Sequence, residues 1–157
     1  MITSFDGEYR AFSNFWYKPV TLEGIAFVDG TIYATNEHAY QAAKTLDFGR
    51  RIEIAAADTP GKAKRLGNHK NTIIRPDWSG VKREIMLDLI RQKFSYTDME
   101  YLLLSTGNQK LVEGNTWHDN YWGICSCEIC NGVGKNWLGK LLMFVRMEIQ
   151  IKKGIEC

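Results

Sequence analysis

The segment TNEHAYQAAK carries the residue types that acid–base and nucleophilic chemistry use. At about 100° per residue of an α-helix, Glu37, Tyr40, Gln41 and Lys44 share one face, and alanines with one leucine fill the opposite side. A carboxylate and an amine on one face can act together on a single ligand. The alternative is a solvated surface on which Glu37 and Gln41 form an ordinary i,i+4 contact.

Three other stretches gather polar and aromatic residues that helix and strand periodicity does not explain. They are RAFSNFW (10–16) with Ser13, Asn14 and Phe15, RPDW (75–78) with Trp78, and EGNTWHDNYWG (113–123) continuing into GVGKNWLGK, with Asp119, Tyr121, Trp122, Gly123, Lys135 and Asn136. Asp119 is either a second acid or base or a simple turn residue, and Trp78 either stacks on a ligand or packs as a hydrophobic staple. Flat aromatic faces, two carboxylates, one amine and glycines before a helix N-terminus suit a sugar-phosphate or nucleotide ligand.

Three of the four cysteines form the cluster CSCEIC (125–130), a C-x-C-x-x-C pattern. A structural zinc takes four ligands, and either His118 or Cys157 could complete the set. The favoured interpretation is reduced loop thiols with no metal and no cofactor. The N-terminal residues MITSFDGEYR do not have the pattern of a secretion signal, so a disulfide framework is not expected.

Length and composition predict a single domain over residues 1–157, with 45% apolar residues and a net charge of +2. This mild positive charge permits an anionic ligand without demanding nucleic acid. No run of about 18 apolar residues occurs and the N-terminus lacks the order of a signal peptide, so we expect a soluble, cytoplasmic protein with no membrane partner.

Periodicity places these residues on an α+β fold that is mostly helical, with a small N-terminal β-sheet. Alternating apolar runs in ITSF and in residues 16–35 predict the strands. Helices are expected from Thr35 or Asn36 to 44, over 50–57, and over 60–67 behind a Thr59 cap. Later helices are expected after RPDW, after a Thr97–Glu100 capping box, and from Asn136.

Eight motifs then occur in an order typical of the NADAR family, which the chain resembles over about residues 5–150. They are F-x-G-x-Y-x-x-F-S-N-F, E-H-A-Y-Q-A-A-K, A-K-x-L-G, R-x-D-W-x-x-V-K, L-x-T-G, L-V-E, H-D-x-Y-W-G and G-K-N-x-L-G-x-L-L-M. The resemblance implies a compact α+β domain, ADP-ribose-type ligands and cleavage of N-glycosidic bonds. By matching position, Glu37 and Lys44 correspond to the family's helix glutamate and lysine, Trp78 to its aromatic residue and Asp119 to its loop aspartate.

The resemblance leaves two substrate classes open. The preferred hypothesis is an N-glycosidase that removes ADP-ribose from guanine bases of DNA or RNA. The first alternative is hydrolysis of the ribosyl-amine intermediates of riboflavin biosynthesis, which is weakened by His118, where the family often has glycine, and by the cysteine insertion. Further alternatives are a non-catalytic ADP-ribose-binding module and a zinc-stabilised protein that interacts with nucleic acid.

The chemistry of a ribosyl C–N bond assigns roles to these residues. Cleavage builds positive charge on the anomeric carbon, so Glu37 could stabilise the sugar or move protons and Asp119 could be the second acid or base. Lys44 either pairs with a phosphate or with Glu37, or attacks the opened sugar as a neutral amine to form a Schiff base. The resemblance favours the covalent role.

Overall fold

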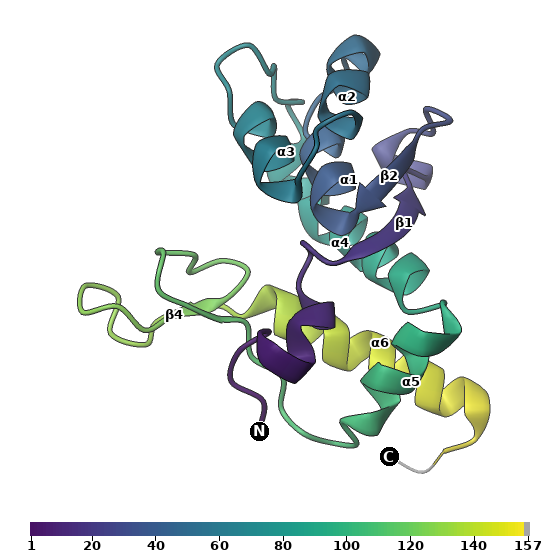
Figure 1. The fold of residues 1–157 in the computed structure, drawn as a ribbon, viewed down its shortest axis with the longest axis vertical. Helices are drawn as coiled ribbons and strands as arrows, with labels where there is room; N and C mark the ends of the chain where they lie inside the picture. Colours follow the sequence, from purple (N-terminus) through teal and green to yellow (C-terminus); the bar gives the residue numbers. More distant parts are fainter. Residues whose placement is uncertain (156–157) are drawn as a thin grey trace. The chain divides into compact units, whose positions relative to one another are not determined.

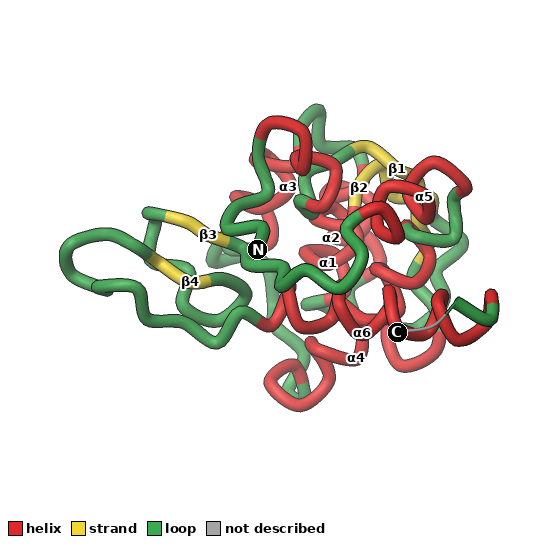
Figure 2. Tube along the Cα trace, turned by 90° about the horizontal axis from the view of Figure 1, so that it is seen from below, coloured by secondary structure: helices red, strands yellow, loops and turns green. Residues whose placement is uncertain are grey.

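The computed structural model describes residues 1–155, and the fold is α+β, as expected. Its helices are η1 (Gly7–Phe12), η2 (Gly24–Ala26), α1 (Asn36–Ala43), α2 (Phe48–Ala55), α3 (Pro60–Gly67), α4 (Trp78–Lys93), α5 (Thr97–Ser105) and α6 (Trp137–Lys153). Strand β1 (Tyr17–Thr21) pairs antiparallel with β2 (Ile32–Thr35). In the long loop before α6, β3 (Gly114–Asn115) pairs parallel with β4 (Ile124–Cys125), as Figure 2 shows.

The chain separates into two compact units. One is the continuous segment Asn14–Lys93, here called the inserted unit. The other, the end unit, consists of Met1–Ser13 together with the chain from Phe94 onward. The expectation of one domain over residues 1–157 stays a prediction.

Helix α1 lies inside the inserted unit, where it contacts α2, α3, α4 and both strands of the hairpin (Figure 1). Thr35 caps the helix, because its Oγ1 accepts a hydrogen bond from His38 N at 3.2 Å. All eight residues of α1 are buried. The alternative of a solvated face is therefore wrong, and Leu46, the leucine on the apolar side of this segment, is 49% exposed. Neighbouring helices cover the polar side of α1 as well as its alanine side.

Local sequence signals fixed α3 correctly. Thr59 is the N-cap, and its Oγ1 accepts a hydrogen bond from Lys62 N at 3.1 Å. Pro60 occupies the first helical position, where its missing N–H costs nothing, and the helix ends at Gly67 as predicted. Helix α2 begins two residues earlier than expected because Asp47 caps it through Arg50 N.

The expected small N-terminal sheet is present as a hairpin, whereas the predicted strand in ITSF and the predicted capping box were wrong. The N-terminal sheet is only the β1–β2 hairpin, since the run between the strands forms η2 and Phe27 then adopts a positive φ of 63°. Residues ITSF contribute an isolated bridge between Ile2 and Leu111. The expected capping box is absent: Thr97 is already helical, and Tyr96 is the N-cap, whose side chain does not cap the helix.

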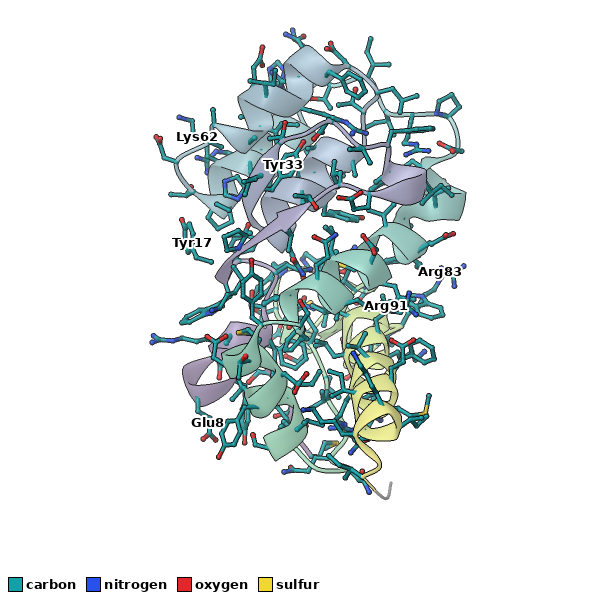
Figure 3. The ribbon with its side chains drawn as sticks, turned by 90° about the vertical axis from the view of Figure 1, so that its right-hand side faces the viewer. Glu8, Tyr17, Tyr33, Lys62, Arg83 and Arg91 are labelled. Carbon is teal, nitrogen blue, oxygen red and sulfur yellow. The ribbon has the colours of Figure 1, made fainter. Side chains whose placement is uncertain are left out.

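Buried polar side chains tie the interior of each unit together. In the inserted unit, Tyr33 (labelled in Figure 3) donates from its hydroxyl to Asp29 Oδ2 at 2.6 Å, and the fully buried Arg51 reaches the same oxygen at 3.2 Å. In the end unit, buried Arg146 of α6 donates to Thr106 Oγ1 at 2.6 Å. No helix in residues 1–155 is long and apolar enough to cross a membrane.

Candidate functional site

Glu37 is a buried carboxyl group on the first turn of α1. Only 7% of its surface is exposed, and its Oε1 accepts a hydrogen bond from Gln41 Nε2 at 2.7 Å. Burial raises the pKa of Glu37, and it outweighs the opposing effects of Gln41 and of the positive charges of Lys64 and Lys44. Glu37 therefore keeps its proton to a higher pH than an exposed glutamate, which suits a group that must donate that proton.

Lys44 follows α1 directly as its C-cap. Its Nζ donates to Asn68 Oδ1 at 2.8 Å. Burial lowers the pKa of Lys44 to about 8, with Lys64 and Lys82 acting in the same direction and Glu37 opposing them. At pH 7 roughly a tenth of the amine is then neutral, far more than for an exposed lysine. This fraction makes Lys44 a competent nucleophile.

The positive charges of Lys44 and Lys64 act on the Glu37 carboxyl group, and those of Lys64 and Lys82 act on Lys44. Lys44 follows α1, Lys64 lies on α3, and Lys82 lies on α4; the last two both lower the pKa of Lys44. Their charges suit a phosphorylated ligand. Lys64 and Lys82 were missing from the predicted site, although the motifs A-K-x-L-G and R-x-D-W-x-x-V-K contain them.

Trp78, the first residue of α4, packs against Tyr40 of α1. The two ring centroids lie 5.0 Å apart with an interplanar angle of 54°. The same Tyr40 ring lies 5.7 Å from Lys44 Nζ. Trp78 is only half-buried, so part of its surface remains for a ligand. The inserted unit thus brings three of the predicted residues, Glu37, Lys44 and Trp78, into one neighbourhood.

Several buried polar atoms beside Glu37 have no hydrogen-bond partner among the described residues. They are Asn14 Oδ1, Asn36 Oδ1 and Nδ2, and Gln41 Oε1. Each such group costs about 1–3 kcal/mol if it stays unpaired, so their concentration at one end of α1 indicates a place where a polar ligand binds. Asn14 also accepts a hydrogen bond from Glu37 N at 3.0 Å through its carbonyl oxygen. Its neighbour Phe15, another predicted binding residue, is 42% exposed.

Gly67 allows α3 to approach the Gln41 side chain. A Cβ atom at this position would lie 2.1 Å from Gln41 Oε1, well inside van der Waals contact. The absence of a side chain at Gly67 therefore leaves room for the Gln41 amide that donates a hydrogen bond to Glu37. In the sequence, Gly67 appeared only as the last residue of the motif A-K-x-L-G.

The remaining predicted residues belong to the end unit. They are Ser13, Asp119, Tyr121, Trp122, Gly123, Lys135 and Asn136. Ser13 is the C-cap of η1, where its N–H donates to Arg10 O at 3.2 Å. A separate group of potential metal ligands, His118 with Cys125, Cys127 and Cys130, lies in the same long loop.

Asp119 forms a turn through its carboxylate. Its Oδ1 accepts hydrogen bonds from Tyr121 N at 3.1 Å and Trp122 N at 2.8 Å. The buried Asn115, which sequence reasoning missed, holds the backbone of Asp119 from both sides: its Oδ1 accepts from Asp119 N at 3.1 Å and its Nδ2 donates to Asp119 O at 2.8 Å. This geometry matches the turn alternative, and an acid–base role of Asp119 stays a prediction.

The backbone amides at the start of α6, which follow the glycines of GVGKN, are hydrogen-bonded within the long loop. The amides of Asn136, Trp137 and Leu138 donate to the carbonyl oxygens of Gly123, Tyr121 and Trp122, at 3.2, 3.2 and 3.0 Å. These donors are therefore already paired, and no amide among the three is left for an anion.

Side chains at this junction also serve the loop. Asn136 is buried, and its amide accepts from Glu113 N at 3.0 Å and donates to Leu111 O at 2.9 Å. Lys135 Nζ lies 5.6 Å from the centroid of the Tyr121 ring, which meets Trp122 edge to face at 5.0 Å. The structure gives Asn136 a structural role, whereas ligand contacts by Lys135, Tyr121 and Trp122 stay predictions.

Comparisons with known proteins agree with this chemistry. The chain is 39% identical to the N-glycosidase YbiA of Escherichia coli, over 93% of this chain and 85% of that protein. It is 41% identical to the N-glycosidase Npun_R5314 of Nostoc punctiforme, over 90% and 86% of the two chains. The NMR structure of E. coli YbiA superposes with a TM-score of 0.77 at 36% identity, covering 99% of this chain and 87% of that chain.

A relative in maize, the chloroplastic riboflavin biosynthesis protein PYRR, is 36% identical over 90% of this chain but only 23% of that protein. The fold and these relatives define a hydrolase that acts on N-glycosyl bonds. The NADAR domain model matches residues 3–150, and the chain belongs to the NADAR family.

Proposed function

We propose that this N-glycosidase removes ADP-ribose from guanine bases of nucleic acid. The observation that carries the proposal is Lys44: a buried amine with its pKa lowered to about 8, beside the buried Glu37. Simple hydrolysis of a glycosidic bond needs carboxyl groups but no amine. A neutral lysine is the nucleophile that an opened, aldehyde-like ribose requires.

In the proposed reaction, Lys44 Nζ forms a bond to the anomeric carbon of the opened ribose. The bond from that carbon to the guanine nitrogen breaks, and the guanine leaves as its amine after gaining a proton. Water then adds to the resulting imine carbon, the bond to Nζ breaks, and ADP-ribose leaves with its aldehyde restored. The net change is the addition of one water across the C–N bond.

Glu37 moves the protons in this scheme. Its raised pKa lets it hold the proton that the departing guanine nitrogen takes up. As a carboxylate it then stabilises the positive imine and removes a proton from the attacking water. The hydrogen bond from Gln41 fixes the Oε1 atom during both steps.

Other residues of the inserted unit bind the substrate in this proposal. Lys64 and Lys82 carry positive charges and neutralise the negatively charged diphosphate of the ligand. Trp78 stacks on a base, an interaction worth about 1–3 kcal/mol. The unpaired amide atoms of Asn36 provide donors and acceptors for ribose hydroxyl groups.

A second candidate substrate is a ribosyl amine of riboflavin biosynthesis. Relatives named as riboflavin biosynthesis proteins in Vibrio vulnificus and maize favour it. Such a substrate also presents an anionic phosphate to the lysines and a C–N bond to Glu37.

Incubating the protein with both substrates side by side tests the proposal. We expect release of ADP-ribose from an oligonucleotide ADP-ribosylated on guanine, measured by liquid chromatography and mass spectrometry, with restoration of the unmodified oligonucleotide. The Glu37→Gln variant is the control for contaminating hydrolases. Turnover of the ribosyl amine alone would replace the proposed substrate with the second candidate.

A further inference from the structure

Four side chains of the long loop converge on one point. The ligand atoms of His118, Cys125, Cys127 and Cys130 all lie within 4.8 Å of one another. His118 Nδ1 lies 3.3 Å from Cys130 Sγ and 3.4 Å from Cys127 Sγ. Three thiols and an imidazole nitrogen are a typical ligand set for a structural zinc ion.

These separations fit a tetrahedral metal. With Zn–S bonds of about 2.3 Å and Zn–N bonds of about 2.05 Å, two sulfurs of a tetrahedron lie about 3.8 Å apart and a sulfur and nitrogen about 3.6 Å apart. The observed nitrogen–sulfur distances are within a few tenths of an ångström of that value. Small side-chain rotations bring the other pairs into range.

The backbone around the cysteines already has the shape of a metal-binding turn. Cys130 N donates to Cys127 Sγ at 3.3 Å, and Asn131 N donates to Cys127 O at 2.9 Å. Asn131 and Gly132 then adopt positive φ values of 48° and 74° and turn the chain back toward β4. There Gly132 N donates to Cys125 O at 2.9 Å, which positions the first cysteine beside the other two.

An outer hydrogen bond supports one of the sulfurs. Asn120 Nδ2 donates to Cys130 Sγ at 3.3 Å, an arrangement that stabilises a thiolate. Asn120 belongs to the same loop as His118, on the opposite side of Asp119. The histidine and this asparagine therefore reach the cysteines from one tight turn.

We propose that His118, Cys125, Cys127 and Cys130 bind one zinc ion as a closed, structural site. The sequence left the choice between His118 and Cys157 as the fourth ligand, and favoured reduced thiols without a metal. The convergence of His118 on the cysteines selects the histidine; Cys157 lies outside the described residues. Four protein ligands leave no open position for water, so the ion stabilises the loop and takes no part in the reaction.

The zinc joins the two ends of the loop segment 118–130, which contains Asp119 and the aromatic pair Tyr121 and Trp122. Cross-linking a segment of this kind reduces the conformational entropy of the unfolded chain. The zinc site thus stabilises segment 118–130, in which the two-residue strand β4 is the only regular secondary structure.

Metal analysis of the full-length protein purified under reducing conditions tests the site. We expect one zinc per chain by native mass spectrometry and by elemental analysis. Cobalt(II) added to the chelator-treated protein should saturate at one equivalent, with the visible bands of tetrahedral cobalt and a near-ultraviolet thiolate-to-cobalt band. Chelation should lower the Tm, and added zinc should restore it.

Matched variants of the same segment identify the ligands. Cys127→Ser and Cys130→Ser should abolish stoichiometric zinc, and Asn120→Ala should weaken zinc affinity about 10–100-fold. Glu128→Gln, an exposed neighbour, and Cys157→Ser should retain full zinc. The cysteine variants should still turn over substrate at a temperature where they remain folded, since no step needs a thiolate or a metal.

Three outcomes would overturn the proposal. The first is wild-type protein that contains no zinc and shows no cobalt bands. The second is an intact mass two hydrogens below that of the reduced chain, which would indicate a disulfide between cluster cysteines. The third is loss of zinc in Cys157→Ser with retention in His118→Ala, which would replace the fourth ligand.

Discussion

Gln41 donates a hydrogen bond to Glu37 across one turn of α1, with 2.7 Å between Nε2 and Oε1. This pair is an i,i+4 contact of the kind that surface helices make, but here both residues are buried. The amide holds one carboxyl oxygen in place without neutralising the group. Its own Oε1 faces Gly67 of α3 and has no hydrogen-bond partner among residues 1–155.

Glu37→Gln should abolish turnover while the fold survives. The variant keeps an acceptor for Gln41 but loses the proton transfer and the charge, which typically costs about 10²-fold or more in rate. Steady-state kinetics on the substrate that the wild type cleaves measures the loss. Wild-type rates in the variant would remove Glu37 from the chemistry.

The same variant should be more stable than the wild type at neutral pH. Burial raises the pKa of Glu37 in the folded state, so the unfolded chain loses this proton first and folding stability falls as the pH rises above the unfolded pKa. Glutamine has no proton to lose. Thermal unfolding should therefore show a higher Tm for the variant at pH 7 and no difference at low pH. A lower Tm at pH 7 would indicate that the carboxylate stabilises the fold.

Lys44→Arg should be as inactive as Lys44→Ala. A guanidinium group stays protonated at any accessible pH and cannot form an imine. Borohydride added during turnover should trap an adduct of ADP-ribose size on Lys44 of the wild type, detected by intact-protein and peptide mass spectrometry. An active arginine variant without a trapped adduct would leave Lys44 as an electrostatic residue.

The rate should follow the ionisation of Lys44. Because the neutral amine is the nucleophile and the pKa of Lys44 is lowered to about 8, protonation of Lys44 should limit kcat/KM on the acid side of the profile, and loss of the Glu37 proton should limit it on the alkaline side. A protonated lysine that only binds phosphate gives the opposite sign, with activity falling above pH 8. A pH profile of kcat/KM distinguishes the two roles.

Trp78→Ala should impair substrate binding more than folding. Loss of a stacking contact of about 1–3 kcal/mol corresponds to a roughly 5- to 150-fold increase in KM. Trp78→Phe keeps a flat face and should recover part of the effect. If the Tm falls and the kinetics of the folded fraction are normal, Trp78 is a packing partner of Tyr40 and no more.

Asp119→Asn separates the turn from the charge. Asparagine keeps an Oδ1 that can accept from Tyr121 N and Trp122 N, so the loop should remain intact. If Asp119 is the second acid or base, the variant loses activity at least about 10²-fold with an unchanged Tm. Activity close to that of the wild type, together with destabilisation in Asp119→Ala, would assign it to the turn.

Local signals were sufficient for much of the fold. The Thr59–Pro60 pair correctly predicted the start of α3, and the helix expected after RPDW is α4, whose buried residues include Val81, Ile85 and Leu89. Strands β3 and β4 were not predicted because two residues are too short for an alternating pattern.

The site was harder to predict because periodicity shows which residues share a face but not what covers that face. Glu37 and Lys44 were identified, yet they are buried, since α1 contacts helices α2, α3 and α4 as well as the hairpin. Lys64 lies on α3 and Glu37 lies on α1, and the spacing of residues along one helix cannot predict a contact between two helices. Asn115 could not be found either, because its partners are backbone atoms of Asp119.

The order of the two units along the chain has a consequence for synthesis. Residues 1–13 are made before the inserted unit but belong to the end unit, where Ile2 N donates to Lys110 O and Val112 N donates to Ile2 O, both at 2.9 Å. The inserted unit has all of its own chain once Lys93 has been added. At about 5–20 residues per second, Met1–Ser13 waits seconds for its partners while Glu37 and Lys44 already have theirs. We therefore expect the inserted unit to fold during synthesis before the end unit is complete.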